Sequence, residues 1–452
     1  MRYRTECPRP SGTHCKTELK STGTPASGTS AGPSREETLS AYPPAANGTS
    51  VPDINVENHA RSRLAVHDDV IATTLRRPSV PPPPIAEELR RRSPLVGVTL
   101  EHRKQIDGLR FFAFLAVFLV HSDITRFWWG SYGVSLFFVI SGFLITRILI
   151  AYENRPRKLV LKNFYARRAL RIFPAYYLVL GLAAATVGIE YLPAFALFVM
   201  NWGIFFYTWI QPELADIAWD PTRMYGIHFW SLCVEEQFYL VFPLLFSFLR
   251  PGRARLSWLL VLWGASIGVR FLCAAFLPKA AYGLIPLVCG EYLVAGAVGA
   301  VVFAGTSGTA ERIRDAARQW MLPVGLALVV AMFTLFRPVA PSIDHVMHPP
   351  HMQTLLALGF LAIVLGLWQT ENRWVLGFFN YAPLRFLGKI SYGLYLIHLF
   401  MWPLVDWLSE HFSAIRELPP FAARLGLTIL LATAMWRLFE APILKLKTRF
   451  PY

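Results

Sequence analysis

One apolar stretch combines an arginine and a histidine at a spacing that suits joint chemistry. Arg110 is followed by ten mostly apolar residues and then by His121. Eleven residues of α-helix turn through about 1100°, close to three full turns, so both side chains share one face about 16 Å apart. We expect Arg110 to bind an anion and His121 to exchange a proton. In the alternative interpretation, Arg110 reaches lipid headgroups and His121 only bonds a neighbouring helix.

Two adjacent carboxylates, Glu235 and Glu236, interrupt another apolar stretch. Charged side chains are costly inside a membrane segment and therefore usually mark a functional site. Ser231, Glu235 and Tyr239 recur every fourth residue and share one helix face. We expect Glu235 to lie at the depth of His121 and to orient its imidazole. The alternative is a buried ion pair between Glu235 and an arginine.

A basic segment carries Arg168 and Arg171, three positions apart on an expected helix. Residues at this spacing face the same way. Two guanidinium groups on one face at a membrane surface suit a phosphate-rich ligand. The alternative is an ordinary basic loop that marks the cytoplasmic side.

Other polar groups give weaker signals, and we expect these residues to have structural roles. Small residues such as Ser141 and Gly142 favour close helix packing. We expect Glu291 to pair with Arg270, and we assign His398, like Glu440, a structural role.

Metal binding is not expected. His345, His348 and His351 share one stretch, but the two prolines between the last two break any regular ligand spacing. Five cysteines contain no C-x-x-C pair, which excludes a thiolate metal site and a disulfide framework.

The composition places these residues in a membrane protein. Hydrophobic residues make up 54% of the 452 residues and charged residues only 16%, whereas soluble domains carry about 25% charge. The net charge of +15 would suit a nucleic-acid partner, but the high content of hydrophobic residues argues against a nucleic-acid-binding protein. In a membrane protein the same excess marks cytoplasmic loops.

Eleven apolar stretches of membrane-spanning length follow residue 105. They are about 106–124, 131–151, 169–189, 192–210, 229–249, 256–277, 284–304, 320–336, 352–369, 390–408 and 421–441. All the basic loops can be cytoplasmic only if 192–210 does not cross, so we interpret it as a re-entrant or interfacial segment. The sequence therefore predicts an all-α integral membrane protein of the inner (cytoplasmic) membrane, with about ten transmembrane helices and both termini cytoplasmic.

Three regions are expected along the chain. Residues 1–104 hold 13 of the 33 prolines and only two of the 64 aromatic residues, so we predict a disordered cytoplasmic tail. This region has no apolar core of a signal peptide, and a misassigned start codon is an alternative origin for it. Residues 105–445 form the transmembrane domain, and 446–452 form a short basic cytoplasmic tail.

Five motifs, in order, resemble those of the membrane-bound acyltransferase family 3, which contains O-antigen and other polysaccharide O-acetyltransferases. They are Asp-Gly-Leu-Arg110-x10-His121, Phe-Phe-Val-Ile-Ser-Gly-Phe, Arg-Arg168-x-x-Arg171-Ile-x-Pro, Trp-Ser-Leu-x-Val-Glu-Glu-Gln-Phe-Tyr and Ser-Tyr-Gly-Leu-Tyr-Leu-Ile-His. The resemblance covers about residues 104–445. It departs mildly at Cys233, where relatives usually have serine. Some relatives carry an esterase-like C-terminal domain, whereas we expect this chain to act as the membrane module alone.

The resemblance implies a cytoplasmic acyl-CoA donor, with acetyl-CoA expected, and a hydroxyl acceptor such as a glycan at the outer face. It implies that Arg168 and Arg171 hold the CoA phosphates and that Arg110 guides the pantetheine or thioester. No permanently bound cofactor, metal or nucleic acid is expected. The remaining partner is the lipid bilayer.

The resemblance also implies roles at the acceptor. His121 is the expected general base, or it briefly carries the acyl group. Glu235 orients His121 or binds the sugar, and Glu236, Ser231 and Tyr239 are further candidate substrate-binding residues.

Two other functions remain as alternatives. The same chemistry could act on a small-molecule natural product such as a macrolide, as in some relatives. A non-catalytic transporter is less compatible with the sequence, because the motif of the first span does not recur in the second half, as inverted repeats would require.

Overall fold

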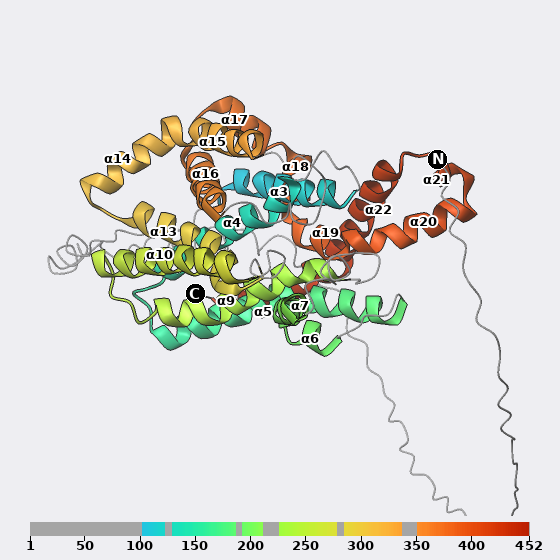
Figure 1. Ribbon diagram of the computed structural model, residues 1–452, viewed down its shortest axis with the longest axis horizontal. Coiled ribbons are helices and arrows are strands. Elements are labelled where there is room, and N and C mark those ends of the chain that lie inside the picture. The colour runs from blue at the N-terminus through green and yellow to red at the C-terminus, as the bar shows by residue number, and fades with distance from the viewer. Residues whose placement is uncertain are drawn as a thin grey trace, which may run out of the picture. The chain divides into compact units, whose positions relative to one another are not determined.

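The computed structural model describes residues 102–122, 129–186, 192–210, 226–277, 284–336 and 350–451. All of them belong to one compact unit, Pro82–Tyr452, and within these ranges the chain forms helices and turns but no strand (Figure 1). The all-helical prediction is thus confirmed for the described part of the chain. The proposed tail at 1–104 lies almost wholly outside the described residues and stays a prediction.

The helices of the first half begin with α3 (Lys104–His121), α4 (Tyr132–Ala151) and α5 (Arg157–Thr186). They continue with α6 (Leu192–Ala196), α7 (Met200–Ile210), η3 (Ile227–Phe229), α9 (Trp230–Phe246), α10 (Arg253–Phe276), α12 (Pro286–Cys289) and α13 (Glu291–Ala304). Arg110 and His121 therefore belong to one uninterrupted helix, as the spacing argument requires.

The second half contains more short helices. Its elements are α14 (Gly308–Ala316), η4 (Ala317–Met321), α15 (Leu322–Leu335), α16 (Pro350–Gln369), α17 (Arg373–Phe379), α18 (Ala382–Lys389), α19 (Ser391–Ile397), η6 (His398–Phe400), α20 (Met401–His411), α21 (Ser413–Arg416), α22 (Pro420–Met435), η7 (Trp436–Glu440), α23 (Ala441–Leu444) and η8 (Lys445–Arg449).

Eight helical segments of the described chain are long and apolar enough to cross a membrane. They are Trp129–Ala151, Arg157–Thr186, Ile227–Phe246, Arg253–Phe276, Pro286–Ala304, Gly308–Leu335, Pro350–Gln369 and Pro420–Arg449. Of the ten expected spans, 106–124 and 390–408 are not among them. The helix at the first position, α3, carries three charged side chains, Lys104, Asp107 and Arg110, and the second stretch includes the polar residues Ser391, His398 and Asp406. The count of ten and the orientation of the termini stay predictions.

The expected re-entrant segment at 192–210 is broken in two. Phe198, between α6 and α7, has a positive φ of 55°, a strained conformation for a residue with a Cβ. The Gln237 amide stabilises this break by donating to the Phe198 carbonyl at 2.7 Å and to Asn201 Oδ1 at 2.9 Å. Neither helix reaches the roughly 20 residues of a regular span, which agrees with a segment that does not cross as a single helix.

The basic loops gather at one end of the helical bundle. Contacts that join them include Arg255 to Glu153 at 2.7 Å, Arg167 to the Lys447 carbonyl at 3.2 Å, Arg171 to the Lys389 carbonyl at 3.1 Å, and Arg318 to Glu371 at 3.4 Å. The expectation that 192–210 does not cross the membrane predicts this arrangement, because it places every basic cluster on the same side. That this side is the cytoplasm stays a prediction.

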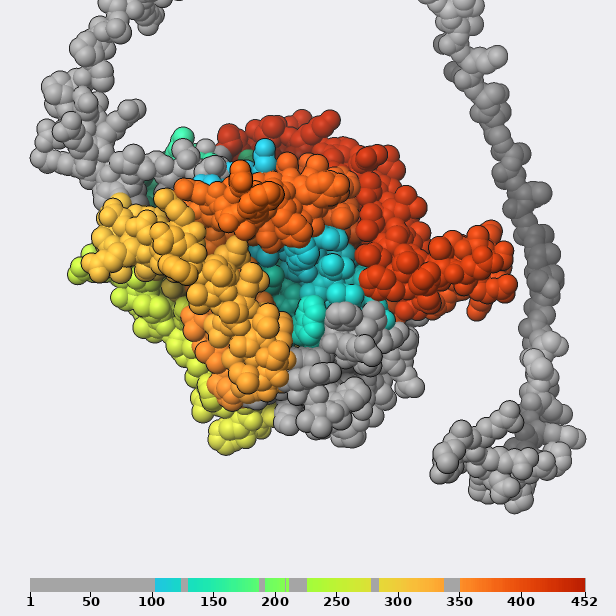
Figure 2. Space-filling view, turned by 90° about the horizontal axis from the view of Figure 1, so that it is seen from above, coloured from blue at the N-terminus to red at the C-terminus, as the bar shows by residue number. Residues whose placement is uncertain are grey.

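Close helix contacts at the centre depend on glycines. Helix α4 packs against α13 so closely that a Cβ at Gly142 would overlap the Leu293 carbonyl oxygen, and one at Gly296 would overlap the Val139 carbonyl oxygen. The packing role expected of Gly142 is therefore confirmed. In Figure 2 the blue to teal surface of α3 and α4 lies between the orange and red surfaces of the C-terminal third.

This close approach predicts that Gly142→Ala destabilises the protein. Separating α4 and α13 to fit one methyl group should cost about 1–3 kcal/mol, which lowers the midpoint of thermal unfolding in detergent. Gly264→Ala in α10 is the matched control, since a Cβ there meets nothing within 4 Å. Equal midpoints for the two variants would contradict the packing argument.

Candidate active site

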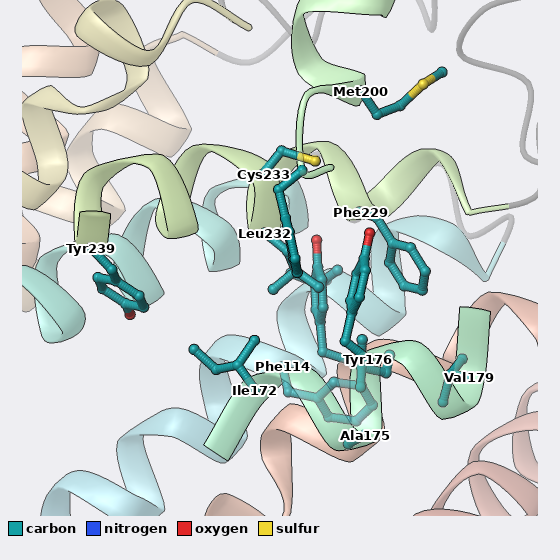
Figure 3. Close-up of a cluster of buried hydrophobic side chains, with 14 of the residues drawn as sticks. Phe114, Ile172, Ala175, Tyr176, Val179, Met200, Phe229, Leu232, Cys233 and Tyr239 are labelled. Carbon is teal, nitrogen blue, oxygen red and sulfur yellow. The ribbon is translucent and has the colours of Figure 1, made fainter. Parts of the chain in front are cut away.

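An apolar cluster sets α9 against α5 and so positions the polar side chains of both helices. Leu232 of α9 faces Ile172 and Tyr176 of α5 (Figure 3), and all three side chains are buried. Further along the same helices, the guanidinium of Arg168 lies over the Tyr239 ring, 4.6 Å from its centroid. Helix packing therefore brings the basic motif and the carboxylate motif together.

Where these helices meet α3, α4 and α19, they enclose a small central cavity of about 80 Å³. Its polar lining consists of Arg110, Ser141, Arg168, Arg171, Ser231, Glu235, Glu236, Tyr239, Ser391, Tyr392 and Tyr395. Seven of the eight residues that the sequence proposed for the site thus line one cavity. The exception is His121.

Glu235 is held by two hydroxyl groups within this cavity. Ser141 Oγ donates to Glu235 Oε1 at 2.5 Å, and the Tyr239 hydroxyl donates to the same oxygen. Donation from two hydroxyls stabilises a partly buried carboxylate without an ion pair. The expected bond from Glu235 to His121 is therefore replaced by bonds to Ser141 and Tyr239, and Ser141 has more than a packing role.

The depth expected for Glu235 was also wrong, because α4 runs antiparallel to α3. Gly130 lies against Ala116, near the end of α3, whereas Phe137 lies under Arg110, 5.9 Å from its guanidinium carbon. Ser141, one turn further along α4, lies beside the first part of α3. Its partner Glu235 is therefore nearer to Arg110 than to His121.

A second, larger cavity of about 500 Å³ adjoins the first, and we call it the basic pocket. Its lining includes one histidine and eight charged residues, namely His102, Arg103, Asp107, Arg110, Arg147, Arg167, Arg168, Arg171 and Lys447. Three of these, Arg110, Arg168 and Arg171, also line the central cavity. The expectation that Arg168 and Arg171 face one way is confirmed, and together with Arg110 they separate the two cavities.

The arginines between the cavities are fixed by neighbouring groups. Arg110 Nε donates to Ser391 Oγ at 3.2 Å. Arg171 donates to the Lys389 carbonyl at 3.1 Å and lies 3.6 Å from the buried carboxylate of Glu440. Preorganised guanidinium groups bind phosphate or carboxylate oxygens with less loss of side-chain entropy.

His121 belongs to a cluster of three histidines from α3, η3 and η6. His398 Nε2 lies 3.3 Å from His121 Nδ1. The ring centroids of His228 and His398 are 4.8 Å apart, and both side chains are buried. Sequence spacing did not reveal this cluster, because its members are more than 100 positions apart.

Backbone carbonyls set the tautomers in this cluster. His398 Nδ1 lies 2.7 Å from the Tyr395 carbonyl, and His121 Nδ1 lies 2.9 Å from the Val117 carbonyl. A carbonyl only accepts, so both Nδ1 atoms carry hydrogen in the neutral rings. His121 Nδ1 then shares its one hydrogen between the Val117 carbonyl and the lone pair on His398 Nε2, so the lone pair of His121 itself is on Nε2, the atom that a base would use.

The histidine cluster and the central cavity share a wall. The Tyr395 hydroxyl donates to the His228 carbonyl at 2.8 Å and lies 2.6 Å from Ser231 Oγ. Both hydroxyls line the cavity, while the Tyr395 carbonyl bonds His398. The histidine cluster and the arginines therefore occupy adjoining compartments along α3.

The sequence contained a signal for the residues that were missed. Ser391, Tyr395 and His398 all lie in the motif Ser-Tyr-Gly-Leu-Tyr-Leu-Ile-His, and His228 lies two residues before the carboxylate motif. The helical spacing of Ser391, Tyr395 and His398 can be read from the sequence. Only packing reveals that they approach Arg110 and His121.

The weaker assignments have mixed outcomes. Glu291 pairs with Arg270, and both side chains are fully buried, which confirms that prediction. The ring of His351 packs against Phe336 at 5.3 Å, while His345 and His348 lie outside the described residues. Within the described ranges, no group of three His, Cys, Asp or Glu side chains has the arrangement of a metal site.

Membrane-length helices around buried charged and hydroxyl side chains define a multi-pass membrane protein with an internal polar site. Comparison with known families identifies which one. The chain belongs to the acyltransferase 3 family, whose model, described as an acyltransferase domain, matches residues 103–437. The family indicated by the five motifs is therefore confirmed.

Two curated relatives illustrate the similarity. The O-acetyltransferase OatA of Staphylococcus aureus is 26% identical over 387 residues, covering 75% of this chain and 57% of the relative. The peptidoglycan O-acetyltransferase OatA of Listeria monocytogenes is 25% identical over 360 residues, covering 75% and 55%. The chain thus spans little more than half the length of these relatives. No solved structure matches it.

Proposed function

We propose that this protein transfers an acetyl group from cytoplasmic acetyl-CoA to a hydroxyl of a cell-envelope glycan. The observation that carries the proposal is the junction of the two cavities at Arg110, Arg168 and Arg171. A cationic pocket suits the phosphates of CoA. The hydroxyl-lined cavity beyond it suits an uncharged arm that leads toward the histidine cluster.

In the proposed reaction, the acceptor hydroxyl oxygen attacks the thioester carbonyl carbon. The carbon–sulfur bond breaks, an ester forms, and His121 Nε2 takes the hydroxyl proton and returns it to the departing thiolate. Arg110 and His121 are about 16 Å apart along α3, a distance that an extended pantetheine arm can bridge. A thioester is already activated, so positioning and proton transfer supply most of the catalysis.

Glu235 receives a different role from the one expected at first. It lies near Arg110 and accepts from Ser141 and Tyr239, so we assign it to the wall along which the donor arm passes. Tyr395 and Ser231 lie between it and the histidines, where they can bond the thioester or the acceptor.

The acceptor class rests on the relatives. The name of the Listeria relative specifies peptidoglycan, which favours a peptidoglycan-like glycan over the O-antigen or exopolysaccharide considered first. Both are hydroxyl-rich envelope polymers, and the chemistry of the site suits either.

Membranes containing the protein, supplied with acetyl-labelled acetyl-CoA and envelope glycan, test the proposed function. Label should enter the glycan as an ester that mild alkali releases, and mass spectrometry of the fragments should identify the acetylated sugar. Membranes with equal amounts of the His121→Asn variant provide the control. Equal labelling in both would overturn the proposal.

A further inference from the structure

The family match ends at residue 437, yet the chain beyond it contributes to the basic pocket. Lys447, in η8, lines this pocket together with residues of α3, α4 and α5. It is half-buried, while Lys445 and Arg449 on either side are exposed. Of these three cations, Lys447 is therefore the one placed to contact a ligand in the pocket.

Helix α5 holds this C-terminal segment in place through backbone carbonyls. Arg167 donates to the carbonyls of Lys447 and Phe450, at 3.2 Å each, and the Asn163 amide donates to the Pro451 carbonyl. These bonds fix the backbone around Lys447 beside the basic motif. The Lys447 ammonium is thereby positioned by the same helix that carries Arg168.

Charge balance in the pocket favours a bound polyanion. Among the described residues, seven arginine and lysine side chains line it with one carboxylate, Asp107, which lies 3.2 Å from His102. Like charges brought together in a partly desolvated pocket repel one another, and a multiply charged anion relieves that repulsion. Glu440 lies close to Arg171 and offsets only part of the positive charge.

We propose that the segment Trp436–Pro451 forms one wall of the donor site and that Lys447 contacts a phosphate of CoA. This inference rests on the proposed acyl-CoA donor. The chemistry required is that of a phosphate group, which an anionic lipid headgroup could also supply, so the test must separate the two sources.

The test measures binding of CoA and of phosphate-free pantetheine to the purified full-length protein in neutral detergent. Loss of one charge-assisted contact should raise the Kd for CoA about tenfold in Lys447→Gln. Pantetheine binding should not change. Lys445→Gln removes the same charge two residues away and should bind CoA like the wild type.

Three outcomes would overturn the inference. They are equal CoA affinity in the two lysine variants, an equal loss of CoA and pantetheine binding, and a Lys447 effect that occurs only when anionic lipid is added. Acetyl transfer by the wild type is measured in parallel. If CoA binding depends on Lys447 but no acetyl group is transferred, the proposed function fails while the phosphate contact stands.

Discussion

Changing His121 to Asn is expected to slow acetyl transfer by about 10²- to 10⁴-fold, the range that general-base catalysis typically contributes. Asn can still bond the Val117 carbonyl that His121 Nδ1 contacts, but its amide cannot accept a proton as an imidazole does. Binding of acetyl-CoA should therefore change little. Single-turnover transfer of label from acetyl-CoA, at equal amounts of inserted protein, measures the chemical step.

His411→Asn is a closely matched control for this experiment. His411 also ends a helix and directs Nδ1 to the carbonyl four residues earlier, at 2.8 Å, as His121 does at 2.9 Å. It lies outside the histidine cluster and is exposed, so its loss should leave transfer unchanged. Near-normal transfer by His121→Asn would remove His121 from the mechanism. Equal loss in both variants would indicate a general effect on folding.

The double change Arg168→Gln with Arg171→Gln should weaken donor binding by about 10²- to 10⁴-fold. Each charge-assisted hydrogen bond to a phosphate contributes about 1.5–3 kcal/mol, and both side chains lie where the basic pocket meets the central cavity. The acceptor approaches from the other side in our proposal, so its apparent affinity should barely change. Equilibrium binding of radiolabelled acetyl-CoA to membranes measures the loss.

Two further variants make this result specific. Arg250→Gln with Arg253→Gln removes the same charge from two exposed arginines of another basic loop and should not affect donor binding. Arg168→Lys with Arg171→Lys keeps the charge but removes the planar fork of donors, so it should restore binding only in part. If Arg168→Gln with Arg171→Gln leaves donor affinity unchanged, both arginines do no more than mark the cytoplasmic side of the membrane.

The sequence by itself determined the class of protein, the family and most residues of the site. Membrane-length apolar runs predicted the helices, and a spacing of eleven positions placed Arg110 and His121 on one helix. Three-residue spacing correctly placed Arg168 and Arg171 on one face. These features were predictable because helical periodicity depends only on neighbours along the chain.

The partners of those residues were decided by tertiary structure. Glu235 bonds Ser141 rather than His121, because the antiparallel contact of α3 with α4 places Ser141 near Arg110. His398 joins His121, although 277 positions separate them.

Periodicity tells which residues share a face, but not which helix that face meets, nor at what offset along the axis. Close packing settles both, through contacts such as that of Gly130 with the Ala116 carbonyl. The local pattern therefore identified the candidate residues, and only the packed bundle separated them into a cationic compartment and a histidine compartment.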